Sequence, residues 1–140
     1  MGNPLNEKTD IGTVISKQQH EKITSYIEHG RNERNVVTHV CCELPQEEEL
    51  QNGLFHRPVV FTNISNDSKV AKEEIFGPVC CVVKWNDFDD VIRQANDTCY
   101  GLSSSIWTKD LKLVFFLIFF FFLSFFFFLI FFFLNFFFFI

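Results

Sequence analysis

Residues 72–78, Lys-Glu-Glu-Ile-Phe-Gly-Pro, place an acidic and an aromatic side chain two positions apart. The carboxylate of Glu74 only accepts hydrogen bonds, and its two oxygens can take both neighbouring hydroxyls of a ribose. Phe76 offers a flat apolar face against which a planar ring can lie. Gly77 is expected to adopt backbone angles that other residues resist, and Pro78 to fix the start of the next strand. The heptad therefore indicates a loop that binds a ribose carrying a planar ring.

The same seven residues also have a plainer interpretation. Two glutamates can end a solvated helix, Phe76 can be a single buried ring, and Gly77 with Pro78 can form a turn. Short motifs have a high rate of false positives, so the heptad in isolation leaves both interpretations open. Only the sequence on either side of it can decide between them.

The cysteines and histidines offer no second reactive centre. No two cysteines have Cys-x-x-Cys spacing, and their odd number predicts reduced thiols and not a disulfide framework. Residues 79–83, which include two of them, form an apolar run typical of a strand buried on both faces. Buried thiols without a nearby cation have a raised pKa and are inert, so we expect no catalytic cysteine. The histidines lack the spacing of metal ligands, which predicts no metal site. The residues concerned are Cys41, Cys42, Cys80, Cys81, Cys99, His20, His29, His39 and His56.

A helix upstream of the heptad is expected to start after Ser16. This serine is suited to cap a helix, and Gln19 follows three positions later, which is the spacing of a capping box. Gly30 is expected to end the helix. Between these ends, larger apolar residues recur at helical spacing, at Ile23, Tyr26 and Ile27. The pattern predicts an amphipathic helix with one face on a core.

Other segments alternate between strand and helix patterns. Four short apolar runs predict strands, at residues 36–37, 59–61, 79–85 and 104–107. A second helix is expected after a cap at Asn86 or Asp87. Its apolar positions follow an i, i+3, i+4, i+7 pattern, at Phe88, Val91, Ile92 and Ala95. Strands that alternate with helices predict an α/β fold with a largely parallel sheet.

Small motifs flank the heptad on both sides. They are Gly-Asn-Pro-Leu at residues 2–5, Lys-Thr-Asp-Ile-Gly at 8–12, Gly-Leu-Phe at 53–55, Arg-Pro-Val-Val-Phe-Thr at 57–62, Ala-Asn-Asp-Thr at 95–98, Tyr-Gly-Leu at 100–102 and Trp-Thr-Lys-Asp-Leu at 107–111. Together with the heptad, these motifs resemble the NAD(P)-dependent aldehyde dehydrogenase family over residues 2 to about 112. The resemblance implies that residues 1–112 form part of that family's α/β catalytic domain.

The resemblance assigns cofactor roles to four residues. In the family, the second glutamate of the heptad, here Glu74, binds the ribose on the nicotinamide side, and the phenylalanine, here Phe76, lies near the nicotinamide. The helix upstream carries further cofactor contacts in the family, and Gln19 and Lys22 fall at the expected positions. The alternative interpretation of Gln19 and Lys22 is that of ordinary surface residues on an exposed helical face. The implied cofactor is NAD or NADP.

The resemblance also limits what this chain can do alone. The family's nucleophilic cysteine, general-base glutamate and oxyanion-hole asparagine lie upstream of the segment that this chain resembles, so no catalytic residue is assigned here. Complete relatives oxidise an aldehyde to a carboxylic acid and assemble as homo-oligomers. We therefore expect a fragment without catalytic activity. Residues 1–112 are also expected to be marginally stable, because part of a domain leaves sheet edges uncovered.

Charge is confined to the first 112 residues. The 12 basic and 17 acidic residues give a net charge of −5, and they form no basic stripe, which argues against nucleic acid as a partner. Residues 1–20 are polar and contain no apolar segment of a secretion signal. These features predict a cytoplasmic location.

Residues 113–140 form an apolar tail without charge, in which 17 of the 28 residues are phenylalanine. As a helix, the tail would be about 42 Å long, which is enough to span a hydrocarbon core of about 30 Å. Lys109 and Lys112 would then favour a cytosolic location for the preceding domain. In that case the chain would be a non-catalytic, tail-anchored membrane protein that keeps an enzyme-derived domain for interaction.

The residue types of the tail indicate an alternative origin. Apart from Asn135, each type has a codon within one base of TTT, so the tail is also typical of a translated thymine-rich tract. Val114 stands where the resemblance ends, and its codons begin with GT, as introns usually do. We therefore expect the reading frame to run past an exon boundary near Val114 into non-coding sequence.

Overall fold

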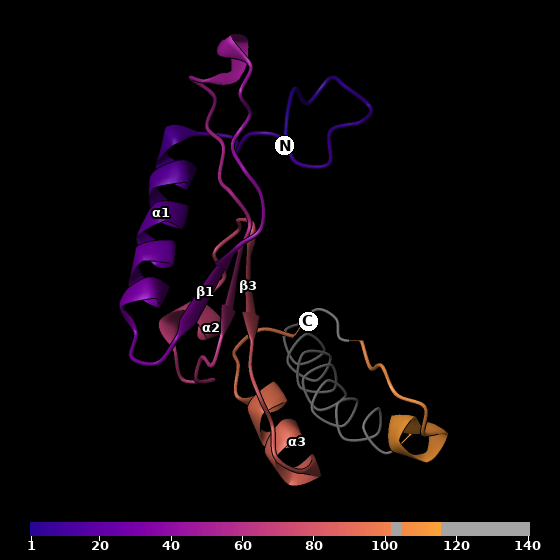
Figure 1. Ribbon diagram of the computed structural model, residues 1–140. Helices are drawn as coiled ribbons and strands as arrows, with labels where there is room; N and C mark the ends of the chain where they lie inside the picture. The colour runs from indigo at the N-terminus through magenta and orange to yellow at the C-terminus, as the bar shows by residue number, and fades with distance from the viewer. Residues whose placement is uncertain (102–104, 116–140) are drawn as a thin grey trace, which may run out of the picture. The chain divides into compact units, whose positions relative to one another are not determined.

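The computed structural model describes residues 1–101 and 105–115, and the chain forms two compact units, Met1–Lys84 and Trp85–Ile140 (Figure 1). In chain order, the first unit contains helix α1 (Lys17–Asn32), strand β1 (Val37–Val40), the short 3-10 helix η1 (Glu48–Leu50), strand β2 (Val59–Thr62), helix α2 (Lys69–Lys72) and strand β3 (Val79–Val82). The second unit contains helix α3 (Phe88–Asn96). Helices and strands alternate along the chain, as the sequence predicts for an α/β fold.

The start of α1 confirms the predicted cap, whereas its end corrects the predicted stop. The backbone N–H of Gln19 donates a hydrogen bond of 3.1 Å to Ser16 Oγ, which satisfies one of the free donors of the first turn. The helix does not end at Gly30 but continues to Asn32. Gly30 is buried instead, and a Cβ atom built on it would lie 2.6 Å from Phe61 Cζ. Close packing, and not helix termination, requires glycine there.

The sheet of the first unit has the strand order β1-β2-β3. β1 and β2 are antiparallel, with Val37 opposite Thr62, and β2 and β3 are parallel, with Val59 opposite Val79. The prediction of a largely parallel sheet is therefore correct for one pair and wrong for the other. Between β2 and β3 the chain crosses over through α2, so the two strands run in the same direction. Between β1 and β2 the chain turns back without a crossover helix, so these strands run in opposite directions.

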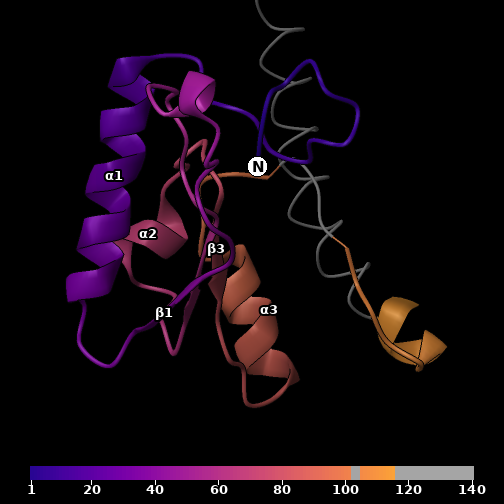
Figure 2. The same cartoon turned by 45° about the horizontal axis from the view of Figure 1, so that its top comes forward.

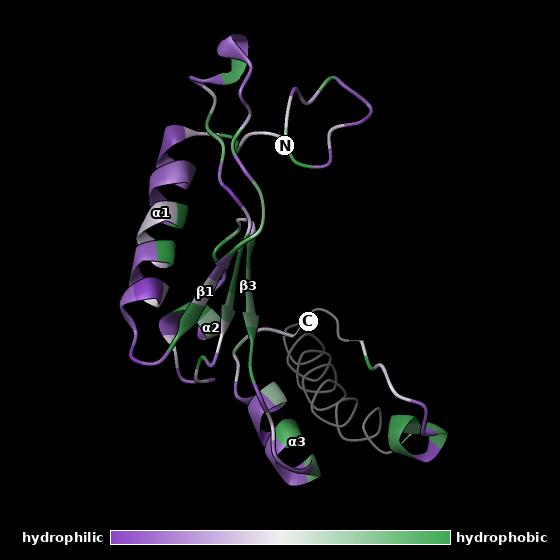
Figure 3. Ribbon diagram, viewed as in Figure 1, coloured by the Kyte–Doolittle hydropathy of each residue, from purple (hydrophilic) through white to green (hydrophobic). Residues whose placement is uncertain are grey.

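One face of the sheet packs on α1 to form the core. α1 runs alongside the strands in both views, and α2 contacts α1 (Figures 1 and 2). The hydropathy colouring shows the apolar stripe of α1 turned toward the sheet and its polar residues turned outward (Figure 3). The buried cluster consists of Ile23, Ile27, Val59, Phe61, Ile64, Val70 and Ile75. Its members come from α1, β2, the loop after β2, α2 and the loop before β3, so the heptad is anchored in the core.

The thiols of β3 correct the prediction of a strand buried on both faces. Burial alternates along the strand: Cys80 is exposed and Cys81 is half-buried, because only one face of the sheet is covered by the core. Cys81 Sγ donates to the carbonyl oxygen of Val70 at 3.4 Å. Burial, followed by the neighbouring Cys80 and Glu33, raises the pKa of Cys81 to about 11. The raised pKa disfavours the thiolate form of Cys81, whereas the thiol of Cys80 is exposed.

The second unit begins with a capped helix. The backbone N–H of Asp90 donates to Asp87 Oδ1 at 2.9 Å, so Asp87 is the cap of α3. Hydrogen bonds from Gln94, Asn86 and Arg93 hold the pKa of the Asp90 carboxyl below its usual value. The strand predicted at residues 104–107 is wrong for residues 105–107, which adopt no strand, while residue 104 lies outside the described residues.

Most of the apolar tail, residues 116–140, lies outside the described residues, and so does the predicted transmembrane helix. Within residues 1–101 and 105–115, no helix has the length and apolar character needed to cross a bilayer.

Candidate functional site

The heptad forms a loop between α2 and β3, and α1 holds its backbone. Gln19 Nε2 donates to two successive carbonyl oxygens of the loop, those of Ile75 and Phe76, both at 2.9 Å. One helical turn later, Lys22 Nζ donates to the carbonyl oxygen of Glu74 at 3.1 Å. All four residues predicted to bind a cofactor are therefore neighbours, although more than 50 positions separate Gln19 and Lys22 from the loop.

Side chains alternate between the core and the solvent along this loop. Ile75 is buried in the core, whereas Glu74 and Phe76 on either side of it are exposed. Phe76 has 74% of its surface exposed, so the interpretation of this residue as a buried ring is wrong. Within the described residues, neither a hydrogen bond nor an ion pair occupies the Glu74 carboxylate. The loop is thus fixed by the buried Ile75 and presents a hydrogen-bond acceptor, Glu74, and an aromatic face, Phe76, to the solvent.

The unusual backbone angle of the loop belongs to Phe76 and not to Gly77. Phe76 has φ of 55°, in the left-handed region that non-glycine residues rarely adopt, whereas Gly77 has no positive φ. Gly77 is required for another reason, because a Cβ atom there would lie 2.6 Å from Cγ1 of the buried Ile23. The prediction that Gly77 adopts backbone angles that other residues resist is therefore wrong. Its role is to let the loop approach α1.

A cluster of cations and rings surrounds the Phe76 side of the loop. Lys22 Nζ lies 5.7 Å from the centroid of the Phe76 ring and 5.8 Å from that of Tyr26. Lys69 Nζ lies 5.1 Å from the Tyr26 ring, and Tyr26 Oη donates to Glu73 Oε2 at 2.5 Å. These are cation–π distances, which favour a fixed place for the lysine charges. Tyr26 was predicted only as an apolar position of the helix, although it follows Lys22 at i+4 on the same face of α1.

Two of the four histidines form a stacked pair that the sequence did not reveal. The ring centroids of His20 and His56 are 4.0 Å apart, and the ring planes are inclined by 26°. His56 Nε2 lies 2.9 Å from the carbonyl oxygen of His20, and His20 Nε2 lies 3.3 Å from that of Phe55. Burial lowers the pKa of His56 more than its hydrogen bond to His20 raises it. The pair fastens α1, one residue after Gln19, to the segment that leads into β2.

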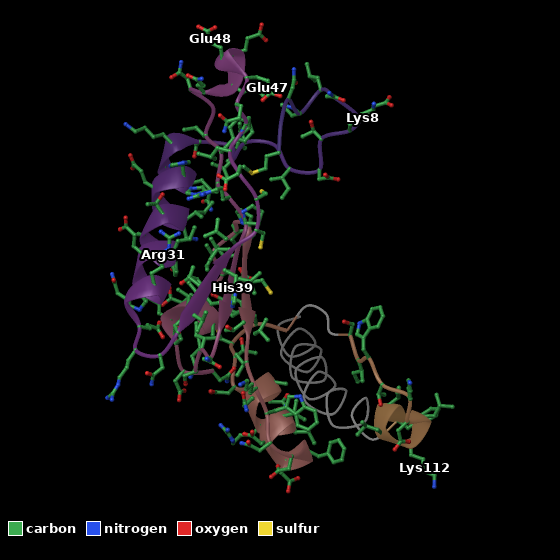
Figure 4. The ribbon with its side chains drawn as sticks, in the orientation of Figure 1. Lys8, Arg31, His39, Glu47, Glu48 and Lys112 are labelled. Carbon is green, nitrogen blue, oxygen red and sulfur yellow. The ribbon has the colours of Figure 1, made fainter. Side chains whose placement is uncertain are left out.

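The other polar groups that the structure describes form no competing site. In the part of the chain that the structure describes, no group of three potential metal ligands comes together. A hollow of about 310 Å³ lies between the N-terminal loop, which carries Lys8, and the segment formed by Glu47 and η1 (Figure 4). Its lining includes Lys8 and Glu47 but none of the four residues predicted to bind the cofactor. On β1, His39 Nε2 lies 3.1 Å from Thr62 Oγ1, a contact within the sheet.

Comparison with known proteins identifies the family. A sequence model described as "Aldehyde dehydrogenase family" matches residues 1–118. Aldehyde dehydrogenase [NAD(P)+] 2 of Saccharomyces cerevisiae is 43% identical over 110 residues, which are 79% of this chain and 21% of that protein. Betaine aldehyde dehydrogenase of Mesorhizobium japonicum is 41% identical over 113 residues, which are 79% of this chain and 23% of that protein.

Solved structures give the same answer. The crystal structure of an NAD-dependent aldehyde dehydrogenase from Sinorhizobium meliloti superposes with a TM-score of 0.74 at 35% identity, over 84% of this chain and 22% of that one. A betaine aldehyde dehydrogenase from Staphylococcus aureus, solved in complex with NAD+, gives a TM-score of 0.69 at 33% identity, over 79% of this chain and 22% of that one. The chain spans about a fifth of the length of the relatives that it matches. This chain belongs to the aldehyde dehydrogenase family.

Proposed function

We propose that the loop of residues 73–78, together with the face of α1 that holds it, is the nicotinamide side of a dinucleotide-binding site. The observation that carries the proposal is the pairing of an exposed acceptor, Glu74, with an exposed ring, Phe76, on a loop anchored by Ile75 and by Gln19 and Lys22. Such a loop is held in place before the ligand arrives, so less conformational entropy is lost on binding. The Staphylococcus aureus relative binds NAD+, which supports the same class of ligand here.

Each residue has a distinct part in this proposal. The Glu74 carboxylate accepts hydrogen bonds from the two hydroxyls of the nicotinamide ribose, and charge-assisted bonds of this kind are stronger than neutral ones. The Phe76 ring lies against the nicotinamide and keeps water away from one of its faces. Lys22, with its charge next to the Phe76 ring, and Gln19 assist from α1. When bound, NAD or NADP supplies the hydride acceptor of the reaction.

We further propose that the complete protein oxidises an aldehyde to a carboxylic acid, as a cytoplasmic homo-oligomer, and that the 140-residue chain alone does not. Aldehyde oxidation of this kind needs an activated thiolate and a general base beside the hydride acceptor. Cys81, with a pKa of about 11, holds almost no thiolate at neutral pH. Cys80 is exposed on β3, where its Sγ donates to the carbonyl oxygen of Cys81 at 4.0 Å, and within the described residues no base is bonded to this thiol. The chain therefore contributes binding groups to the site and leaves the covalent chemistry to other residues.

Titration of the purified chain with NAD+, followed by ligand-observed NMR, tests the binding proposal. We expect Glu74→Gln to weaken binding roughly tenfold, because the charge-assisted hydrogen bonds are lost while the shape of the side chain is kept. Phe76→Ala is expected to weaken it as well. Glu28→Gln, an exposed change of the same kind on α1, serves as the matched control and should leave the affinity unaltered.

Three results would contradict these proposals. Equal affinity of the wild type and of Glu74→Gln for NAD+, or no binding by the wild type at millimolar NAD+, would remove the assigned ribose contact. Formation of NADH from NAD+ and a simple aldehyde such as propanal by the purified chain would show that the chain is catalytically complete.

A further inference from the structure

We propose that Gln19 is a positioning residue: its side-chain amide keeps Phe76 in the left-handed backbone conformation and thereby sets the direction of the Glu74 and Phe76 side chains. A phenylalanine at φ of 55° is disfavoured because its Cβ atom crowds the following carbonyl group. Such a conformation persists only where its surroundings hold it. The amide of Gln19, bonded to the carbonyl oxygens of Ile75 and Phe76 at 2.9 Å each, provides that hold.

The hydrogen-bond capacity of the amide separates this role from direct contact with a ligand. A glutamine NH2 group has two N–H donors. Both acceptors within reach of Gln19 Nε2 are loop carbonyls on successive residues, one before and one after the strained φ angle. With both donors committed, Gln19 acts on a ligand through the loop. Lys22 adds a third bond to the carbonyl of Glu74, so three consecutive carbonyl groups are held from α1.

The base of this arrangement is rigid. The backbone N–H of Gln19 is itself bonded to Ser16 Oγ at 3.1 Å, inside the first turn of α1. The next residue, His20, stacks on His56 at 4.0 Å between ring centroids. On the loop side, Gly77 packs against Ile23, where a Cβ atom would come within 2.6 Å of Cγ1. The Gln19 amide thus joins the backbone of α1 to the backbone of the loop, and only rotation of the Gln19 side chain would break that link.

The proposal predicts a specific response to Gln19→Glu in the full-length chain. A carboxylate has no donor, and it would face two carbonyl oxygens, so we expect it to turn away and release Phe76 from the left-handed region. The expected signature is a change of the Phe76 backbone chemical shifts and coupling constant from left-handed to extended values. Exchange of the Val79 amide hydrogen, which is bonded to the carbonyl oxygen of Gly77 at 2.8 Å, should accelerate roughly tenfold.

A control and a rescue make the test selective. Gln18→Glu introduces the same charge one residue earlier on an exposed position and should change neither signal. In the Phe76→Gly background, Gln19→Glu should accelerate exchange of the Val79 amide hydrogen by less than about threefold, because glycine adopts positive φ without strain and does not need the Gln19 amide to hold it. Unchanged Phe76 signals in Gln19→Glu, or an equal acceleration in the Phe76→Gly background, would overturn the proposal.

The consequence for the ligand rests on the proposed function, whereas the loop measurements do not. If the loop binds NAD+, Gln19→Glu should weaken that binding roughly tenfold while Gln18→Glu leaves it unchanged. If the loop responds as expected but the wild type does not bind NAD+, the positioning role stands and the proposed function fails. If NAD+ binds normally while Phe76 stays left-handed in Gln19→Glu, the positioning role fails and the proposed function stands.

Discussion

Gly30→Ala is the simplest change that tests how the core and α1 fit together. Glycine inside a helix usually costs stability relative to alanine, so the substitution would be expected to help by about 1 kcal/mol on helix propensity alone. The structure predicts the opposite. The added Cβ atom would lie 2.6 Å from Cζ, 2.8 Å from Cε2 and 3.1 Å from Cε1 of the Phe61 ring. Carbon atoms attract one another best at about 3.5–4.0 Å, so the ring or the helix must move by roughly 1 Å.

The size of the effect follows from how freely Phe61 can move. Its side chain is 0% exposed and belongs to the central strand β2, where it packs within the buried cluster. Forcing extra volume into such a site costs typically about 1–3 kcal/mol, which exceeds the gain of about 1 kcal/mol from helix propensity. We therefore expect Gly30→Ala to lower the free energy of unfolding by roughly 1 kcal/mol.

The assay is urea denaturation of the chain in mild detergent, followed by far-UV circular dichroism. Phe61→Leu removes the ring atoms that the new Cβ would strike. In the Phe61→Leu background the clash is gone and the helix-propensity gain remains, so Gly30→Ala should then raise stability by up to about 1 kcal/mol. Glu28→Ala, on the exposed face of the same helix, should change stability by less than about 0.5 kcal/mol.

The reversal of sign between the two backgrounds is the decisive observation. Stability of Gly30→Ala equal to or above that of the wild type would refute the steric argument. The same loss of stability with and without the Phe61 ring would show that Gly30 acts through its backbone, as the predicted helix stop would require.

Three further predictions address the thiols, the histidine pair and the tail. At pH 8, iodoacetamide should modify Cys80 well before Cys81, because Cys80 is exposed and burial raises the pKa of Cys81 to about 11. Mass spectrometry of the labelled chain measures both rates, and equal rates would contradict the prediction. Since the lowered pKa of His56 means that the folded chain prefers the neutral ring, stability should be complete above pH 6.5 and decline as the pH falls below it. His56→Gln, which keeps an N–H for the carbonyl of His20, should flatten that decline in urea denaturation between pH 7 and pH 5, and an unaltered decline would assign it to other groups. The native transcript should splice near the codon of Val114, which sequencing it checks, whereas a message that encodes the phenylalanine run would show that the tail is made.

Local sequence patterns predicted the parts of the fold that depend on near neighbours. Ser16 caps α1 and Asp87 caps α3, because a cap needs only the side chain and an N–H group three residues later. The heptad was likewise identified from consecutive residues, and the resemblance to the family that it carried is confirmed by the match over residues 1–118. Whether Glu74 and Phe76 bind a cofactor stays a prediction.

The errors arose where a distant residue decides the local outcome. Gly30 is required by the Phe61 ring on β2 and Gly77 by Ile23 on α1, and no spacing within either segment reveals these partners. The stacking of His20 on His56 joins positions 36 residues apart in the same way. The direction of β1 relative to β2 depends on how the intervening chain returns, which the strand patterns do not contain.

The position of Ile23 on α1 explains why the site and the core cannot be varied independently. Ile23 is 0% exposed, fills the core and limits Gly77 to a residue without Cβ. Two residues of the same helix hold the carbonyl groups of the loop. Gln19 lies four residues before Ile23, and Lys22 lies one residue before it. Helical periodicity therefore fixes the core contact and the loop contacts together. A rotation or shift of α1 that relieved strain in the core would move the donors away from the loop, so the contacts that stabilise the fold also set the geometry of the proposed ligand site.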